Sequence, residues 1–270
     1  MKAFFDLSPK MLLKSFLGLI ISIVLSYLFY KEYFKNTDYS ILNINFPWLI
    51  LSILCVSISY FFRQIRWGIM LEQKGLYIHE MYIYSCIFNS FLPLRAGDLY
   101  RIHASSKIVS VPRAIKNLVI ERIFDLVFIT LILFFLIMDA KVVFLFISIG
   151  LSIAYVFFFS SKVGKKYFKI YLLTISSWVF EAFAFYFTAY AILNHPPLFN
   201  VMVLMPVGAL STIIPSAPGA IGTYDFFVAK ALSMMDYKSE FIINFTLVTH
   251  LQLICVPLLN YIFLKAYKLR

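Results

Sequence analysis

Residues 170–193 read IYLLTISSWVFEAFAFYFTAYAIL, an apolar stretch whose single charged side chain is Glu181. About 20 predominantly apolar residues are enough for an α-helix to cross the hydrocarbon core of a bilayer. The stretch therefore predicts a membrane-spanning helix. Other stretches share its length and character, and together they predict six spanning helices, at residues 11–30, 47–66, 117–138, 141–160, 170–193 and 242–264.

The composition of the whole chain agrees with this prediction. Of its 270 residues, 62% are hydrophobic and only 14% are charged, and the mean hydropathy is +0.87. Soluble domains are about 45–50% apolar and about 25% charged, and one of this size could not cover so much apolar surface. We therefore expect an all-α fold, a polytopic membrane helical bundle that forms a single domain over residues 1–270.

The net charge of +11 has two readings. On a soluble protein it would suggest nucleic acid as a partner, but no nucleic-acid-binding motif is visible. In a membrane protein, Lys and Arg gather in cytoplasmic loops and face anionic lipid. We expect membrane lipids as partners and no nucleic acid.

Two further apolar segments are interrupted by helix breakers. Residues 90–97 read SFLPLRAG and residues 212–219 read TIIPSAPG, so both run hydroxyl, two apolar residues, proline, three residues, glycine. Proline removes a backbone N–H and clashes with the preceding turn, and glycine permits unusual dihedrals. Each segment is predicted to be a short helix, a break and a second short helix, with breaks formed by Pro93, Gly97, Pro215, Pro218, Gly219 and Gly222.

The basic residues predict an orientation in the membrane. Both chain ends are rich in Lys and Arg, which predicts that the N-terminus and the C-terminus are cytoplasmic. Basic residues after the second span, among them Arg63 and Arg66, and those of residues 95–116 also mark the cytoplasmic side. Segments 79–110 and 201–235 must then re-enter from opposite faces, as an inverted repeat would. Alternatively, each break is a kink or surface loop and the sequence match is accidental.

Three charged residues lie close together near the start of the third predicted span. Glu121 and Asp125 are four residues apart and share a helix face, and Arg122 and Asp125 are three apart and can pair. This cluster is either a structural ion pair or a functional polar core.

Glu181 lies in the middle of a predicted span. A charged group at bilayer depth is costly and usually faces a partner or a cavity. The candidate partners of Glu181 are Arg95, Arg101 and Arg122.

No pattern in the sequence indicates a metal, a cofactor or a catalytic centre. The four histidines lack metal-ligand spacing, and there is no phosphate-binding Gly-Lys loop and no Gly-x-Ser-x-Gly motif. We therefore expect no metal, no cofactor and no enzymatic activity.

Three motifs together resemble a known family. Residues 89–101 (NSFLPLRAGDLYR), 121–125 (ERIFD) and 218–225 (PGAIGTYD) are similar in order and spacing to motifs of the lysylphosphatidylglycerol synthase transmembrane family, the flippase-like domain of multiple-peptide-resistance proteins. The family often has Glu where this chain has Asp98 and Asp225. The resemblance implies a lipid-translocating domain. Because the chain ends soon after the last predicted span, the soluble domain that transfers lysine is expected to be absent, and that activity is not carried over.

The leading hypothesis is a flippase for a phospholipid or a lipid-linked glycan in the cell's inner membrane. Arg95 and Arg101 would hold an anionic head group. The other charged site candidates would balance these arginines or bind a cationic group, and they are Asp98, Glu121, Arg122, Asp125, Glu181 and Asp225.

Two other classes of function remain open. One is an accessory protein without transport of its own, which positions a lipid synthase or glycosyltransferase encoded nearby. The other is a membrane-embedded transferase that acts on polyprenyl-phosphate sugars, although the lack of a long loop disfavours it.

Overall fold

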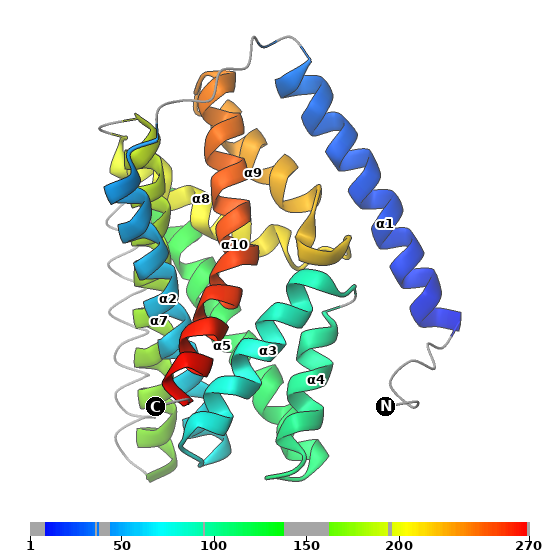
Figure 1. Cartoon of the computed structure of the whole chain (residues 1–270), viewed down its shortest axis with the longest axis vertical. Coiled ribbons are helices and arrows are strands. Elements are labelled where there is room, and N and C mark those ends of the chain that lie inside the picture. The colour runs from blue at the N-terminus through cyan, green and yellow to red at the C-terminus, as the bar shows by residue number, and fades with distance from the viewer. Residues whose placement is uncertain are drawn as a thin grey trace.

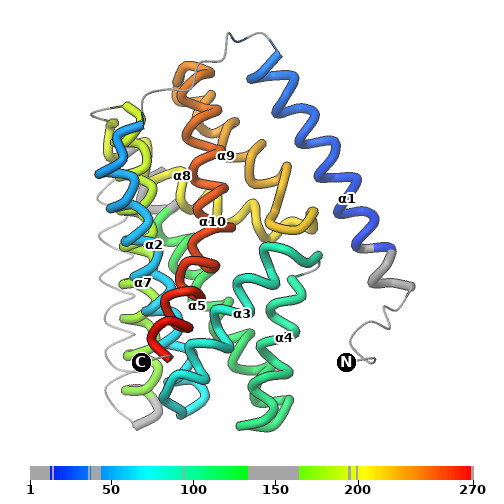
Figure 2. The backbone as a smooth tube through the Cα atoms, in the orientation of Figure 1, coloured from blue at the N-terminus to red at the C-terminus, as the bar shows by residue number. Residues whose placement is uncertain are grey.

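The computed structural model describes residues 9–35, 37, 44–93, 95–137, 162–193 and 196–268, which form helices and contain no strand (Figures 1 and 2). This confirms the all-α bundle. The elements are α1 (Pro9–Phe29) with η2 (Tyr30–Phe34), α2 (Phe46–Leu71), α3 (Leu76–Phe91), α4 (Ala96–Ser105), α5 (Val111–Ile137), α7 (Lys162–Leu193), α8 (Leu198–Ser211), η3 (Pro218–Ala220), α9 (Thr223–Ser233) and α10 (Ser239–Lys268).

Four of the predicted spans correspond to helices of sufficient length and apolarity. In the described part of the chain these are Ser15–Phe34, Phe46–Leu71, Gly164–Leu193 and Ser239–Lys268. The predicted span 117–138 is helical as α5, which is not among the four because charged residues crowd its first half. The predicted span 141–160 lies outside the described residues.

The long helices α2 and α7 pack along each other, and α10 lies against both. A buried polar contact joins the three helices. Gln252 Nε2 donates to the hydroxyls of Ser52 and Thr188 at 3.0 Å each, and these two hydroxyl oxygens lie 2.8 Å apart. Such interhelical bonds contribute about 0.6 kcal/mol each in membranes. Their main effect is to fix which faces of α2 and α7 point inward.

Two half-length hairpins enter the bundle from opposite ends (Figure 1). One is α3 and α4, and the other is α8 and α9 with η3 between them. Their tips meet. A methyl group added at Gly219 would lie 3.1 Å from the Ser90 carbonyl oxygen, so the second break lies against the end of α3. Each segment is a helix, a break and a second helix, since α3 ends at Phe91 before α4 begins at Ala96, and α8 ends at Ser211 before α9 begins at Thr223.

The first break is built differently from the prediction. Gly97 lies inside α4 at the contact with α3, where a Cβ would overlap the Ser85 carbonyl oxygen, so glycine is needed for close approach. Arg95 takes the left-handed conformation, with φ +54°. The Gly97 N–H donates to Asn89 Oδ1 at 2.9 Å, which ties the two helices of this hairpin together.

The second break agrees with the prediction that glycine supplies unusual dihedrals. Gly219 and Gly222 have φ +68° and +83°. A Cβ on Gly222 would overlap the Ser22 carbonyl oxygen, and Ala217 N donates to Ser22 Oγ at 2.6 Å. The second break is therefore held against α1.

One end of the bundle gathers the ends of α2, α4 and α10 and the starts of α3, α5 and α7 (Figure 1). There Glu72 lies 2.6 Å from Lys166 and 2.9 Å from Arg113. Hydrogen bonds from these two cations lower the pKa of Glu72. The small stabilisation from this surface contact is present above the ordinary carboxyl pKa and lost as the pH falls through the lowered pKa.

The placement of Arg63 and Arg66 in a basic loop was wrong. Helix α2 continues to Leu71, so both arginines lie within it, and Arg66 is fully buried. Carboxylates from other helices neutralise them, which allows the helix to carry charge where hydropathy alone would end the span.

Candidate functional site

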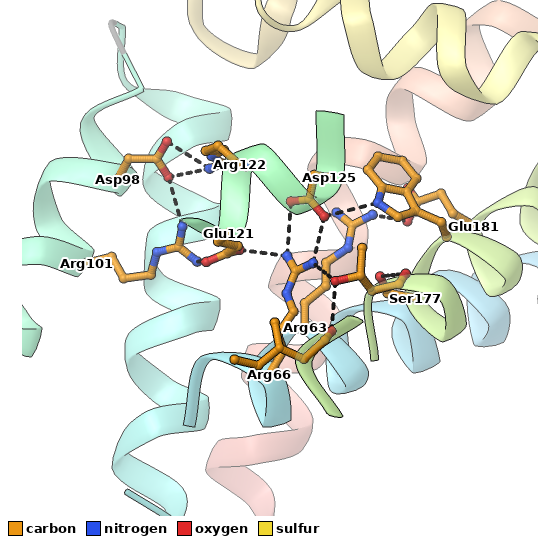
Figure 3. A network of polar contacts seen from close by, with 12 residues as sticks. Arg63, Arg66, Asp98, Arg101, Glu121, Arg122, Asp125, Ser177 and Glu181 are labelled. Atoms are coloured by element: carbon orange, nitrogen blue, oxygen red, sulfur yellow. Dashed lines mark hydrogen bonds and ion pairs between the residues drawn. The ribbon is translucent and has the colours of Figure 1, made fainter. Parts of the chain in front are cut away.

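Four arginines and four carboxylates form a network inside the bundle (Figure 3). They come from α2, α4, α5 and α7, and their formal charges cancel. A neutral network lowers the free-energy cost of burying so many charges inside the bundle, because each group has a partner of opposite sign.

Arg66 is the central member of the network. Its Nη1 donates to Asp125 Oδ1 at 2.7 Å and to Thr174 Oγ1 at 2.7 Å, and its Nη2 donates to Glu121 Oε1 at 2.9 Å and to Asp125 Oδ2 at 3.0 Å. Trp178 Nε1 also donates to Asp125, at 3.1 Å. The planar guanidinium thus joins α2 to α5 and α7 through its two-pronged geometry.

Arg101 extends the network into the first hairpin. Its Nη1 lies 3.0 Å from Glu121 Oε2 and its Nη2 lies 3.5 Å from Asp98 Oδ1. The guanidinium carbon lies 4.4 Å from the centre of the Trp67 ring, a cation–π contact. Arg122 then holds Asp98 with two bonds of 2.8 Å. Arg101 is buried and paired, so it is not free to bind a phosphate.

Glu181 belongs to the same region of the bundle. Its Oε2 accepts hydrogen bonds from Ser59 Oγ at 2.7 Å and from Arg63 Nη2 at 3.0 Å. The Arg63 guanidinium lies over the Trp178 ring at 4.5 Å. This pair joins α2 to α7 in the middle of both helices.

Arg95 differs from the other arginines. It lies at the tip of the first hairpin, half-buried, between Pro93 and α4. Every other arginine in the described part of the chain has a carboxylate within 4 Å, whereas the Arg95 side chain makes no hydrogen bond or ion pair with any residue that the structure describes. The neutral network therefore has one additional, unpaired cation beside it.

Asp225 lies in the second hairpin, apart from the arginines. Its Oδ2 accepts from the Gly222 N–H at 3.0 Å and caps α9. Its Oδ1 lies 2.6 Å from His250 Nδ1, and His250 Nε2 lies 2.8 Å from the Gly219 carbonyl oxygen. The predicted set of site residues is therefore divided between two places.

The order of these features along the chain matches a known family. A family model described as the lysylphosphatidylglycerol synthase TM region matches residues 15–163 and 158–259. The chain belongs to this family. Comparisons with curated proteins and with solved structures gave no match. The matched ranges of this lysylphosphatidylglycerol synthase TM family member include both hairpins, the whole charged network and the Asp225–His250 pair.

Two predicted pairings are wrong for this family member. Glu181 pairs with Arg63 and not with Arg95, Arg101 or Arg122, and Arg122 pairs with Asp98 and not with Asp125. Glu181 pairs with Arg63 because α2 packs along α7. Asp125 pairs with Arg66 of α2, and Arg122 is left to pair with Asp98 of α4. The cluster at 121–125 is indeed an ion-paired core, but its partners come from α2 and α4.

Sequence reasoning missed Arg63, Arg66 and His250 as members of these clusters. A usable signal existed for Arg66, because residues 67–71 read WGIML and continue an apolar helix beyond it. His250 lies mid-span in α10 between apolar turns, as Glu181 does in α7. In the described part of the chain, no group of three or more His, Cys, Asp or Glu could hold a metal ion.

The Arg63–Glu181 pair offers a test of the network in this family member. Replacing Glu181→Gln should lower the free energy of unfolding by about 1.5–3 kcal/mol, because a hydrogen bond to a charged group is lost and Arg63 remains unpaired. The double variant Arg63→Gln with Glu181→Gln should lose less than the sum of the singles. Melting of the purified protein in detergent, run as a double-mutant cycle, measures this coupling. Additive losses would contradict the pairing.

Proposed function

We propose that this protein moves the anionic head group of a phospholipid or lipid-linked glycan across the cell membrane and makes no covalent change to it. The observation that carries the proposal is Arg95, an unpaired guanidinium at the place where two broken hairpins meet. Every neighbouring arginine already has a carboxylate partner. Membership of the lysylphosphatidylglycerol synthase TM family supports a site for lipids.

A lone cation in an apolar bundle is unfavourable and is usually matched by a partner or by water. A phosphate suits Arg95 because the guanidinium fork donates two hydrogen bonds at once. The backbone around the two breaks also has polar groups that must face protein or a wet cavity and not lipid. A head group that enters between the hairpin tips would satisfy both needs.

The two hairpins provide a path for such a head group. In the proposed arrangement the α3–α4 hairpin re-enters from the cytoplasmic face and the α8–α9 hairpin from the opposite face, with the N-terminus and the C-terminus cytoplasmic. The tips then meet near the middle of the membrane, as in transporters that bind their substrates between discontinuous helices. Small movements of either tip would expose Arg95 to one face or the other.

Replacement of Arg95 provides the test. The purified chain is reconstituted into phosphatidylglycerol-containing vesicles, and the movement of fluorescently labelled phosphatidylglycerol between leaflets is measured. Arg95→Gln should slow flipping roughly ten- to a hundredfold, since about 1.5–3 kcal/mol of charged hydrogen bonding is lost. Arg95→Lys should also slow it, because the two-pronged geometry is lost although the charge is kept. The melting temperature should stay unchanged, because Arg95 has no hydrogen bond or ion pair to lose with any residue that the structure describes.

The matched control is Arg113→Lys, which changes an arginine of the exposed Glu72 contact and should leave flipping unchanged. Normal flipping by both Arg95 variants at normal stability would exclude the phosphate role. If the unaltered chain moves no lipid, the transport function is excluded and the accessory role remains.

A further inference from the structure

A second polar centre joins the other hairpin to α10 and is separate from the arginine network. Asp225 at the start of α9 and His250 in the middle of α10 are both buried, with 7% of each residue exposed. The imidazole lies between Asp225 Oδ1 at 2.6 Å and the Gly219 carbonyl oxygen at 2.8 Å. It thus connects the carboxylate that caps α9 to the backbone of the second break.

These two contacts determine how many protons the pair must hold. A carbonyl oxygen only accepts, so Nε2 of His250 must carry a hydrogen. A carboxylate also only accepts, so Nδ1 needs a second hydrogen, unless the hydrogen lies on Asp225 itself. In both arrangements the pair holds one proton more than a carboxylate beside a neutral imidazole. The two contacts therefore require a net neutral pair.

Few other charges face this pair. The Tyr224 ring lies 5.1 Å from the imidazole. Helix α8 contains no titratable residue, residues 18–26 of α1 contain none, and the end of α3 near the break contributes Ser90. Glu181 of α7 is paired with Arg63. The protonation of the pair is thus governed by Asp225 and His250 themselves.

We propose that Asp225 and His250 form a proton-binding site that locks the second break. When the pair gives up its proton to water, a carboxylate and a neutral imidazole remain, and the pair gains one negative charge. One of the two contacts then lacks a hydrogen, and two acceptors face each other. Either the contact of His250 with Gly219 or its contact with Asp225 is lost, and the uncompensated buried charge favours access of water to the break.

The position of the lock connects it to the first hairpin. Gly219 contacts Ser90 at the opposite tip, and Ala217 is held by Ser22 of α1. Release of Gly219 would therefore loosen the contact between the two tips. The additional consequence that lipid movement is coupled to protons rests on the function proposed above, whereas the proton site itself does not.

The proton site is tested directly on the full chain in lipid nanodiscs. Nuclear magnetic resonance of ¹⁵N-labelled histidine and ¹³C-labelled aspartate is recorded from about pH 5 to about pH 9, a range that brackets the ordinary histidine pKa. His250→Gln assigns the His250 signals by their loss. At neutral pH we expect either an imidazolium beside a carboxylate or a neutral imidazole beside a protonated carboxyl. A neutral imidazole beside an ionised Asp225 at neutral pH would overturn the proposal.

The lock is tested by thiol labelling in a chain without its three native cysteines. A cysteine at Ser216 reports on the second break, and one at the exposed Val111, which starts α5 away from both hairpin tips, corrects for the pH dependence of the reagent. The ratio of the two labelling rates should rise as the pair loses its proton, and the rise should be absent in Asp225→Asn and in His250→Gln. A ratio that does not change with pH in the unaltered sequence would overturn the lock. So would an unchanged rise in both variants.

The outcomes separate this proposal from the proposed function. Lipid flipping together with a deprotonated pair at neutral pH would reject the proton site and keep the transport function. A protonated pair and a pH-dependent break in a chain that moves no lipid would reject transport and keep the proton site.

Discussion

Replacing Arg66→Met should lower the free energy of unfolding by about 3–5 kcal/mol, among the largest effects expected for a single side chain in this protein. Removing one partner of a buried ion pair leaves an uncompensated buried charge, and Arg66 serves two carboxylates, Glu121 and Asp125. Thermal and denaturant unfolding of the purified protein in detergent measure the loss. The matched control is Arg113→Met, whose exposed contact with Glu72 should contribute little.

A rescue experiment shows whether the loss of stability comes from a buried carboxylate that is left without a cation. The double variant Arg66→Met with Asp125→Asn removes one cation and one carboxylate, and it keeps Glu121 as the partner of Arg101. Replacing a complete buried ion pair by neutral groups is often close to neutral for stability, so the double variant should recover much of the loss. A double variant as unstable as the sum of the two single variants would show that Arg66 acts mainly through packing.

Replacing Gly97→Ala should prevent the first hairpin from closing. The added methyl group would overlap the Ser85 carbonyl oxygen and lie 2.7 Å from Asn89 Oδ1. Backbone atoms cannot move aside as a flexible side chain would, so the cost should reach or exceed the roughly 1–3 kcal/mol of overpacking. The matched control is Leu99→Ala on the exposed face of α4, which should change stability by less than about 0.5 kcal/mol.

The Gly97→Ala variant should also affect the candidate site. If α4 moves away from α3, then Asp98 and Arg101 move with it, and their contacts with Arg122 and Glu121 weaken. Melting temperature and lipid flipping should therefore fall together. A Gly97→Ala protein with normal stability would contradict the close helix contact.

The two hairpins contribute different kinds of polar group to the interior of the bundle. The first hairpin brings Arg95 beside a neutral ion-paired network, and the second brings the Asp225 carboxylate against the His250 imidazole of α10. The hairpin tips meet at Ser90 and Gly219. The anion site proposed at one tip and the proton site proposed at the other would therefore be separated only by this contact.

Local sequence patterns were enough to predict the class of the protein and the order of helix, break and helix in both hairpin segments. Long apolar runs predicted helices that match α1, α2, α7 and α10, because hydropathy over about 20 residues is a local property. Proline and glycine predicted both breaks for the same reason, since their effect on the backbone does not depend on distant residues. The motifs at 89–101, 121–125 and 218–225 identified the family that the comparison confirmed.

Which charged side chains pair with one another depends on how the helices pack. Glu181 needed a cation, but the choice of Arg63 depends on the packing of α2 against α7. Asp125 had Arg122 within reach on its own helix, yet it pairs with Arg66 because neighbouring helices bring a better-oriented guanidinium. The sequence did not distinguish Arg95 from the other arginines. It became distinct because each of the other arginines that the structure describes pairs with a carboxylate. Which ion pairs form inside the bundle depends on which helices are neighbours. The spacing of charged residues along one helix does not show this.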